Sequence, residues 1–246
     1  MAQMPIEVVD VGTVSRDSLG QAISLADDIQ SEFVYLFLPQ GEARGLRVHA
    51  YKNANLDNLL RAVRRFRLTL AGYHPYLIAF VDTQIGSGRF TNLFWGSLPA
   101  EGLAVVTIAN VSDVIVPSNR MVAYYLYFLA VQTLCFIAPE HQGHDDTRGC
   151  VFDFMENKAD IRKSMKPRAL CDECRSTLVD GHSPIAPQHL DVLDQSACPI
   201  RELGQERGCG QEKASQSIYR LIHRRAKSSQ YYTQVAGGKS CSGCLE

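Results

Sequence analysis

The sequence lacks an excess of charge of either sign. Its 246 residues include 25 lysines and arginines and 26 aspartates and glutamates, so the formal net charge at pH 7 is -1. Without a basic excess, the overall charge gives no reason to expect a nucleic-acid partner. The hydrophobic content of 46% is that of an ordinary globular protein, and the length suffices for one large domain or for a domain with an appendage.

We also expect no segment that directs the chain to a membrane or anchors it there. The first twelve residues, MAQMPIEVVDVG, have neither a cationic start nor an apolar stretch ending in small residues, so we expect no signal peptide and a cytoplasmic protein. The most apolar stretch, residues 121–138, approaches the length of a membrane span but contains several tyrosines, a glutamine and a threonine. It predicts a buried core helix, and no membrane partner is expected.

The first half of the chain alternates apolar runs with amphipathic segments. The runs predict strands of one mixed sheet, and the amphipathic segments predict helices that flank it. The expected strands cover residues 6–14, 33–39, 46–52, 75–82 and 103–111. This pattern predicts an α/β (α+β) fold.

One of the expected helices, residues 55–73, has a basic side. Its apolar residues fall on a single stripe, which leaves four arginines on the other side: Arg61, Arg64, Arg65 and Arg67. Single-stranded nucleic acids need aromatic side chains on which bases stack, and the only aromatic residue among these arginines, Phe66, belongs to the core stripe. The arginines are therefore expected to be a solvated helix face, and nucleic acid is not an expected partner.

Residues 179–246 have a different composition. They lack sustained periodicity, are rich in glutamine, serine, glycine and arginine, and predict a weakly ordered appendage with one short helix at residues 215–227. Four cysteines lie here, and a second metal site is one interpretation, but we expect unligated thiols. They are Cys198, Cys209, Cys241 and Cys244.

The other four cysteines are Cys135, Cys150, Cys171 and Cys174. Cys171 and Cys174 form a C-x-x-C pair, which places two thiolates on one tight turn and suits half of a tetrahedral zinc site. His144 and Cys150 are expected to complete a Cys3His set. The alternative is that Cys150 is a small buried apolar residue and that the pair are free thiols.

These residues lie in a stretch that resembles the archaemetzincin family of zinc peptidases. That family carries an HExxHxxGxxH motif followed by a cysteine, a second cysteine after four residues, and a later C-x-x-C pair. His144 matches the third histidine of the motif, Cys150 the second cysteine, and Cys171 and Cys174 the last pair, whereas Asp145 stands at the first cysteine. The resemblance spans residues 6–178 and implies a zincin-like mixed sheet with a structural zinc.

The catalytic part of the motif is replaced. Leu134 and Ala138 stand at the two helical histidines, Cys135 at the catalytic glutamate, and His141 at the glycine of the turn. Leucine and alanine cannot bind zinc, and cysteine cannot do the proton work of glutamate. We therefore expect a catalytically inactive, zinc-stabilised relative that works as a binding or regulatory protein with a protein partner.

A hydrolase with a rebuilt site is the alternative. Glu140, His141 and His144 could surround one catalytic ion, with Asp145 or Asp146 as a further ligand. The residue types also leave open whether His144 or Asp145 is the fourth ligand of the structural site.

The expected domain comprises residues 1–178 and includes a zinc subdomain at residues 143–178. Within that subdomain we expect one helix over residues 151–170, with Asp153 and Lys158 as solvated charges on its polar side.

Overall fold

The computed structural model describes residues 3–11, 16–29, 33–38, 53–70, 74–115, 119–141, 143–165 and 170–180. The chain divides into two compact units, Met1–Gln205 and Glu206–Glu246, and every described residue belongs to the first. The predicted strand at residues 46–52, the predicted helix at residues 215–227 and the predicted appendage after residue 180 lie outside the described residues.

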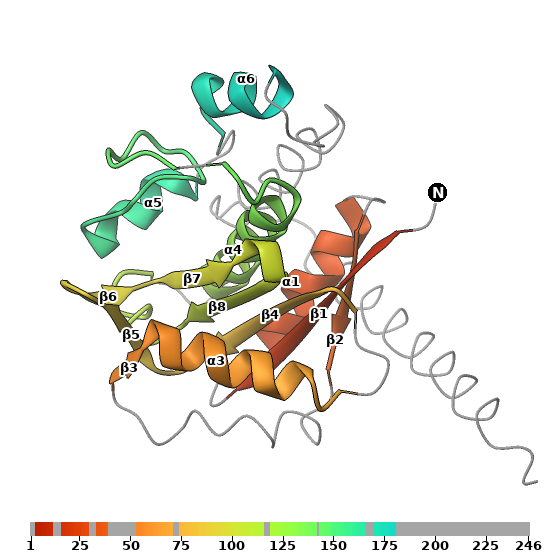
Figure 1. Cartoon of the computed structure of the whole chain (residues 1–246). Helices are drawn as coiled ribbons and strands as arrows, with labels where there is room; N and C mark the ends of the chain where they lie inside the picture. The colour runs from red at the N-terminus through yellow and green to blue at the C-terminus, as the bar shows by residue number, and fades with distance from the viewer. Residues whose placement is uncertain are drawn as a thin grey trace, which may run out of the picture. The chain divides into compact units, whose positions relative to one another are not determined.

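A five-stranded sheet forms the centre of the fold (Figure 1). Its strand order is β2-β1-β4-β8-β7; β1, β2, β4 and β8 are parallel, and β7 is antiparallel to β8. The strands are β1 (Met4–Val11), β2 (Phe33–Phe37), β4 (Tyr76–Val81), β7 (Trp95–Leu98) and β8 (Leu103–Thr107). Strands β4 and β8 are nearly continuous apolar runs because both faces of the sheet are covered.

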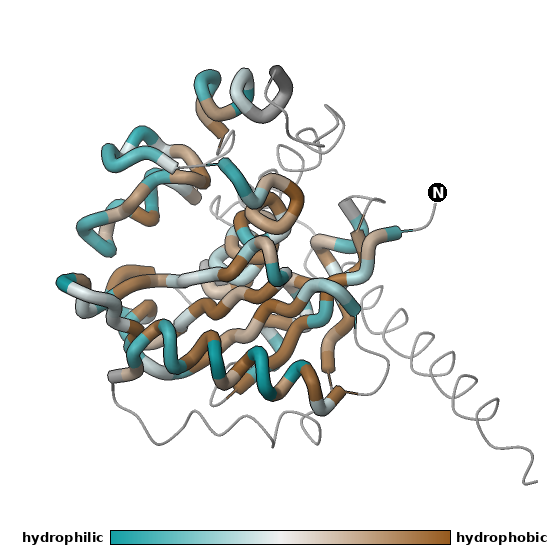
Figure 2. The backbone as a smooth tube through the Cα atoms, in the orientation of Figure 1, coloured by the Kyte–Doolittle hydropathy of each residue, from teal (hydrophilic) through white to brown (hydrophobic). Residues whose placement is uncertain are grey.

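Helices cover both faces of this sheet. Helices α1 (Arg16–Ile29) and α4 (Asn119–Ile137) pack on one face, in a core that includes Ile78 and Phe80 of β4. Helix α3 (Leu56–Arg67) packs on the other face, against alternate residues of the same strands. Figure 2 shows how hydropathy differs between the sheet and this helix: the strands are mostly hydrophobic, whereas hydrophilic and hydrophobic residues alternate along α3.

The described side chains of α4 are buried on every side of the helix, so the predicted core helix is confirmed. In the described part of the chain, no helix is long and apolar enough to cross a bilayer.

Three of the arginines on the basic side of α3 form polar contacts at the protein surface. Arg64 forms an ion pair with Glu101 at 3.0 Å, and Arg67 donates to the Glu101 backbone carbonyl at 2.6 Å. Arg61 donates to the Asn58 side chain at 2.7 Å. These contacts fit the expected solvated helix face and add nothing in favour of nucleic acid.

A second, smaller sheet lies beside β7. It contains β3 (Asn53–Asn55), β5 (Gln84–Ser87) and β6 (Phe90–Leu93) in the order β3-β5-β6, with β5 and β6 antiparallel. A 3₁₀ turn, η1 (Pro99–Glu101), connects β7 to β8.

The chain after α4 is mostly irregular. It contains η2 (Lys158–Asp160), the short helix α5 (Ile161–Ser164) and α6 (Asp172–Asp180). The single helix predicted over residues 151–170 is therefore wrong. The Asp153 carboxylate accepts hydrogen bonds from neighbouring backbone N–H groups, and such local bonds compete with helix formation.

Lys158 is not the solvated charge that the sequence predicted. Its ammonium group lies 4.6 Å from the centre of the Phe94 ring, a cation–π distance. Burial lowers the pKa of Lys158 to about 8.

Candidate metal centre and adjoining groove

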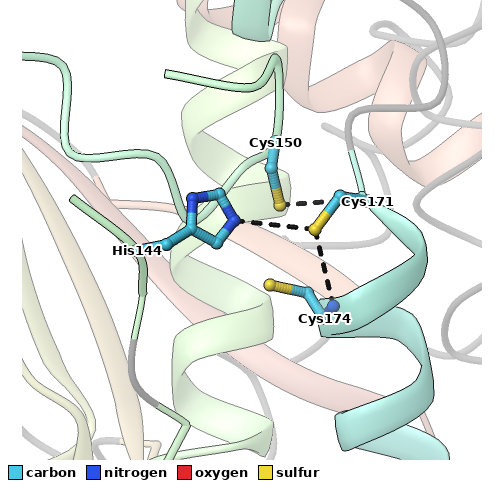
Figure 3. A group of neighbouring side chains, drawn as sticks. All are labelled: His144, Cys150, Cys171 and Cys174. Carbon is cyan, nitrogen blue, oxygen red and sulfur yellow. Dashed lines mark hydrogen bonds between the residues drawn. The ribbon is translucent and has the colours of Figure 1, made fainter. Parts of the chain in front are cut away.

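The structure brings together the four residues predicted to bind zinc (Figure 3). The ligand atoms of His144, Cys150, Cys171 and Cys174 all lie within 4.8 Å of one another. His144 and Cys150 come from the loop after α4, and Cys171 and Cys174 come from the turn that starts α6. We call this group the Cys3His cluster.

The geometry of the Cys3His cluster fits a tetrahedral metal ion. Zinc bonds of about 2.3 Å to sulfur and about 2.0 Å to nitrogen place neighbouring ligand atoms about 3.5 to 3.8 Å apart. The His144 Nε2 atom lies 3.6 Å from the Cys171 sulfur, within that range. The group could therefore hold a metal ion.

Backbone N–H groups support two of the sulfurs. The Cys171 N–H donates to the Cys150 sulfur at 3.5 Å, and the Cys174 N–H donates to the Cys171 sulfur at 3.5 Å. Helix α6 begins at Asp172, so Cys171 also lies at the positive end of a helix dipole. Both effects stabilise thiolate, the form in which cysteine binds metals.

The three thiols differ in their tendency to ionise. Burial raises the pKa values of Cys150 and Cys174. Burial also acts to raise the pKa of Cys171, but hydrogen bonds from the Cys174 backbone and from His144 outweigh it and lower that pKa. Metal binding to this cluster must therefore release protons from the buried thiols.

Asp153 has a structural role that the sequence did not predict. This residue was predicted to be solvated, which is wrong: it is 4% exposed. One oxygen, Oδ2, accepts from the Gly149 N–H at 2.6 Å, the Cys150 N–H at 2.9 Å and the Ser164 hydroxyl at 3.1 Å. The other, Oδ1, lies 3.1 Å from His144 Nδ1 as an ion-pair contact.

The His144 ring thus has Nδ1 near Asp153 Oδ1 and hydrogen-bonded to the Asp146 carbonyl at 3.2 Å, and Nε2 toward the sulfurs. Burial acts to lower the pKa of His144, but the Asp146 carbonyl, Cys171 and Asp153 outweigh it and raise that pKa. A carboxylate behind a ligating imidazole is a common way to fix its orientation. The signal in the sequence was an aspartate three residues after Cys150, close enough to hydrogen-bond the backbone of the same turn.

Replacement of Asp153 by asparagine should weaken zinc binding about 10- to 100-fold, because such partners typically contribute that much to metal affinity. The measurement is a competition titration against a chromophoric chelator. Asp146→Asn is the matched control, because the Asp146 side chain is exposed and its contact with His144 is 3.8 Å. Equal affinities for Asp153→Asn and the wild type would contradict this role.

A backbone bridge places His144 beside Asp153. The His144 N–H donates to the Phe152 carbonyl at 3.2 Å, and the Phe154 N–H donates to the His144 carbonyl at 2.9 Å. At Gly143 a Cβ would run into the Phe152 carbonyl oxygen, so this close approach requires glycine.

The other polar residues near His144 in the sequence, Glu140, His141 and Asp145, do not belong to the Cys3His cluster. Asp145 is exposed and lies outside the Cys3His cluster, so the structure brings His144 and not Asp145 to the sulfurs. The His141 Nε2 atom lies 3.4 Å from the Cys174 sulfur, and the His141 ring packs on Phe152 at 4.2 Å between centres. Glu140 is exposed. Both histidines thus contact cysteines of the cluster, and no observation favours a hydrolytic site that combines them with Glu140.

The positions that would carry the catalytic motif lie near the end of α4. Leu134 is 1% exposed, Cys135 6% and Ala138 4%. Burial raises the pKa of Cys135 to about 12, so this thiol is neutral near pH 7. Leu134 and Ala138 have no metal-binding atom, and the neutral Cys135 thiol is not a general base.

A groove of about 660 Å³ adjoins the cluster. The β5–β6 hairpin, β7 and the end of α4 contribute its walls, and its lining includes Phe90, Trp95, Ala138 and Phe154. The rings of Phe90 and Phe154 contact each other at a tilt of 59°, with 4.8 Å between their centres. His144 also lines this groove, so one residue belongs to both sites.

Comparison with solved structures identifies the fold. An archaemetzincin from Archaeoglobus fulgidus, solved in complex with malonate, matches 70% of this chain and 99% of its own with a TM-score of 0.52 at 15% sequence identity. The chain has the archaemetzincin fold. The predicted mixed sheet with flanking helices is confirmed by this match.

Two further structures are similar to the chain at lower scores. An archaemetzincin from Methanopyrus kandleri matches 79% of this chain and 95% of its own, with 14% identity and a TM-score of 0.48. A zinc-dependent peptidase from Methanocorpusculum labreanum matches 70% and 99%, with 13% identity and a TM-score of 0.48. No protein-family model and no curated protein sequence matches the chain.

The four tail cysteines, which we expect to be unligated thiols and for which a second metal site is the alternative, all lie outside the described residues. That expectation remains a prediction.

Proposed function

We propose that this chain is a zinc-stabilised binding protein that has the archaemetzincin fold and no peptidase activity. One observation carries the proposal. The end of α4 presents Leu134, Cys135 and Ala138 where a catalytic site would need two imidazoles and a carboxylate, and His144 points its Nε2 atom at the Cys3His cluster. The described residues therefore provide the donors of a closed structural site, and the end of α4 does not provide those of an open catalytic one.

Zinc is the metal that suits these donors. Three sulfurs and one imidazole nitrogen form a soft, four-membered set, and tetrahedral Cys3His sites are typical of structural zinc. His144, Cys150, Cys171 and Cys174 would hold the ion, and Asp153 would orient the imidazole. The bound ion would join the loop after α4 to the start of α6.

The groove supports a binding role. Its volume and its mixture of aromatic and polar residues suit a short polypeptide segment. Strand β7 ends the strand order of the main sheet, and Trp95 and Ser97 of this strand line the groove. An extended segment of a protein partner can add to such an edge through its backbone. We place the partner in the cytoplasm, with neither membrane nor nucleic acid involved.

The zinc-loaded chain should show no zinc-dependent cleavage of peptide or protein substrates above background. The measurement uses a mixture of quenched fluorescent peptides, with metal content determined in the same sample. Glu140→Ala and His141→Ala serve as paired variants, because the alternative hydrolase would use both residues. Cleavage by the wild type that is lost in both variants, with folding intact, would overturn the proposal.

Peptides selected from a random library should bind in the groove and protect the backbone amides of β7 from hydrogen exchange. Ala138→Trp should abolish this binding, because the indole would fill the groove beside Trp95. Leu68→Ser is the matched control: Leu68 is 73% exposed and does not line the groove. Selected peptides that bind Ala138→Trp as well as the wild type would contradict the assignment of the groove.

A further inference from the structure

Cys171 differs from the other described cysteines in its accessibility. Cys135, Cys150 and Cys174 are buried, whereas Cys171 is only partly buried. It directly precedes the nine-residue helix α6, and its sulfur accepts the Cys174 N–H. A sulfur that is reachable from solvent, hydrogen-bonded and at a helix start is in the kind of environment that makes cysteines reactive.

A second sulfur lies close to this accessible one. The sulfur atoms of Cys150 and Cys174 are both within 4.8 Å of the Cys171 sulfur. Cys174 follows in the first turn of the helix, so the pair has the arrangement in which a first sulfur reacts and a second one resolves the product. An ion pair between Arg148 and Glu173 connects the Cys150 loop to this helix and keeps the segments together.

We propose that Cys171 is a site of oxidation by hydrogen peroxide or an organic hydroperoxide, and that this oxidation opens the Cys3His cluster. The inference rests on the proposed zinc site. It assigns to the cluster a regulatory property, sensitivity to peroxide, in addition to its structural role.

The reaction has two balanced steps. The Cys171 sulfur attacks a peroxide oxygen, the O–O bond breaks, and a sulfenic acid forms while the other oxygen takes a proton and leaves as water or alcohol. The Cys174 sulfur then attacks the Cys171 sulfur, an S–S bond forms, and the sulfenic oxygen takes a proton and leaves as water. The two sulfurs lose two electrons, and the peroxide gains them.

The disulfide removes two thiolates from the cluster. His144 and Cys150 remain, and two donors are too few for a closed tetrahedral site. The expected consequence is loss of the metal, with the imidazole of His144 freed at the wall of the groove.

The test uses the full zinc-loaded chain with the four tail cysteines replaced by serine, so that only the described cysteines report. Hydrogen peroxide is added in steps, released zinc is read with a chromogenic chelator, and remaining thiols are alkylated and located by mass spectrometry. We expect zinc release to parallel formation of a Cys171–Cys174 disulfide, and a dithiol reductant to restore both thiols and zinc binding. Cys171 should be modified about tenfold faster than Cys150.

Cys135→Ser is the matched control, since Cys135 is buried outside the cluster, and it should behave as the wild type does. Zinc retained through peroxide excess, or first modification at Cys150 or Cys174, would overturn the inference. If the purified chain binds no zinc at all, the proposed zinc site is contradicted. In that case, trapping of sulfenic acid with a dimedone reagent still tests Cys171: a label there supports its reactivity, and no label overturns it.

Discussion

A chain that carries both Cys171→Ser and Cys174→Ser will be recovered without zinc and will lose the ordered structure of the segment after α4. The substitutions remove two of the four donors, and serine hydroxyls do not replace thiolates in structural sites. Structural zinc sites in small domains have apparent binding free energies of about 10 to 16 kcal/mol at pH 7, and much of that energy appears as folding free energy. The effect on local stability should therefore exceed that of an ordinary core substitution.

Metal analysis per chain and thermal unfolding measure this loss. Cys135→Ser again provides the comparison, because it changes a buried cysteine on α4 and leaves the Cys3His cluster intact. A wild-type protein that is purified without metal and remains stable in chelator would exclude the zinc site.

Removal of zinc from the wild type by a strong chelator should loosen one part of the fold and leave the rest. Hydrogen exchange should accelerate in residues 143–165 and 170–180, while β1, β4 and β8 remain protected. The strands and α3 form an apolar core on one face of the sheet that contains no residue of the cluster. On the other face, cluster residues Cys150 and Cys174 belong to the buried core that α1 and α4 form against the sheet.

The same chelator saturated with zinc beforehand is the control for nonspecific effects. Uniform acceleration over all described residues would show that the metal supports the whole domain. No change near Cys150 and Cys171 would show that no metal was bound there.

Much of the fold could be predicted because its strongest signals are local. The apolar runs that became β4 and β8 are buried on both faces, and the mostly apolar stretch that became α4 is buried all round. Such apolar runs indicate that a segment is buried even when the segments that cover it are not known. The C-x-x-C pair is equally local, because one turn brings both sulfurs together.

The features that the sequence left open or predicted wrongly depend on contacts between segments. Whether His144 or Asp145 approaches the sulfurs is decided by the bridge between His144 and Asp153, which orients adjacent side chains differently. The charge of Asp153 suggested solvent, but three hydrogen bonds and an ion pair compensate for its burial. No periodicity in residues 151–165 could show these partners.

The membership of His144 in two sites at once has a thermodynamic consequence. A partner segment that touches the groove wall would meet a side chain that the bound ion would also contact. If the partner prefers the metal-loaded wall by some factor, then the ion is held more tightly by the same factor while the partner is bound. Binding of the partner in the groove and binding of the ion in the cluster are then coupled equilibria. A titration of either ligand in the presence and absence of the other gives the coupling free energy.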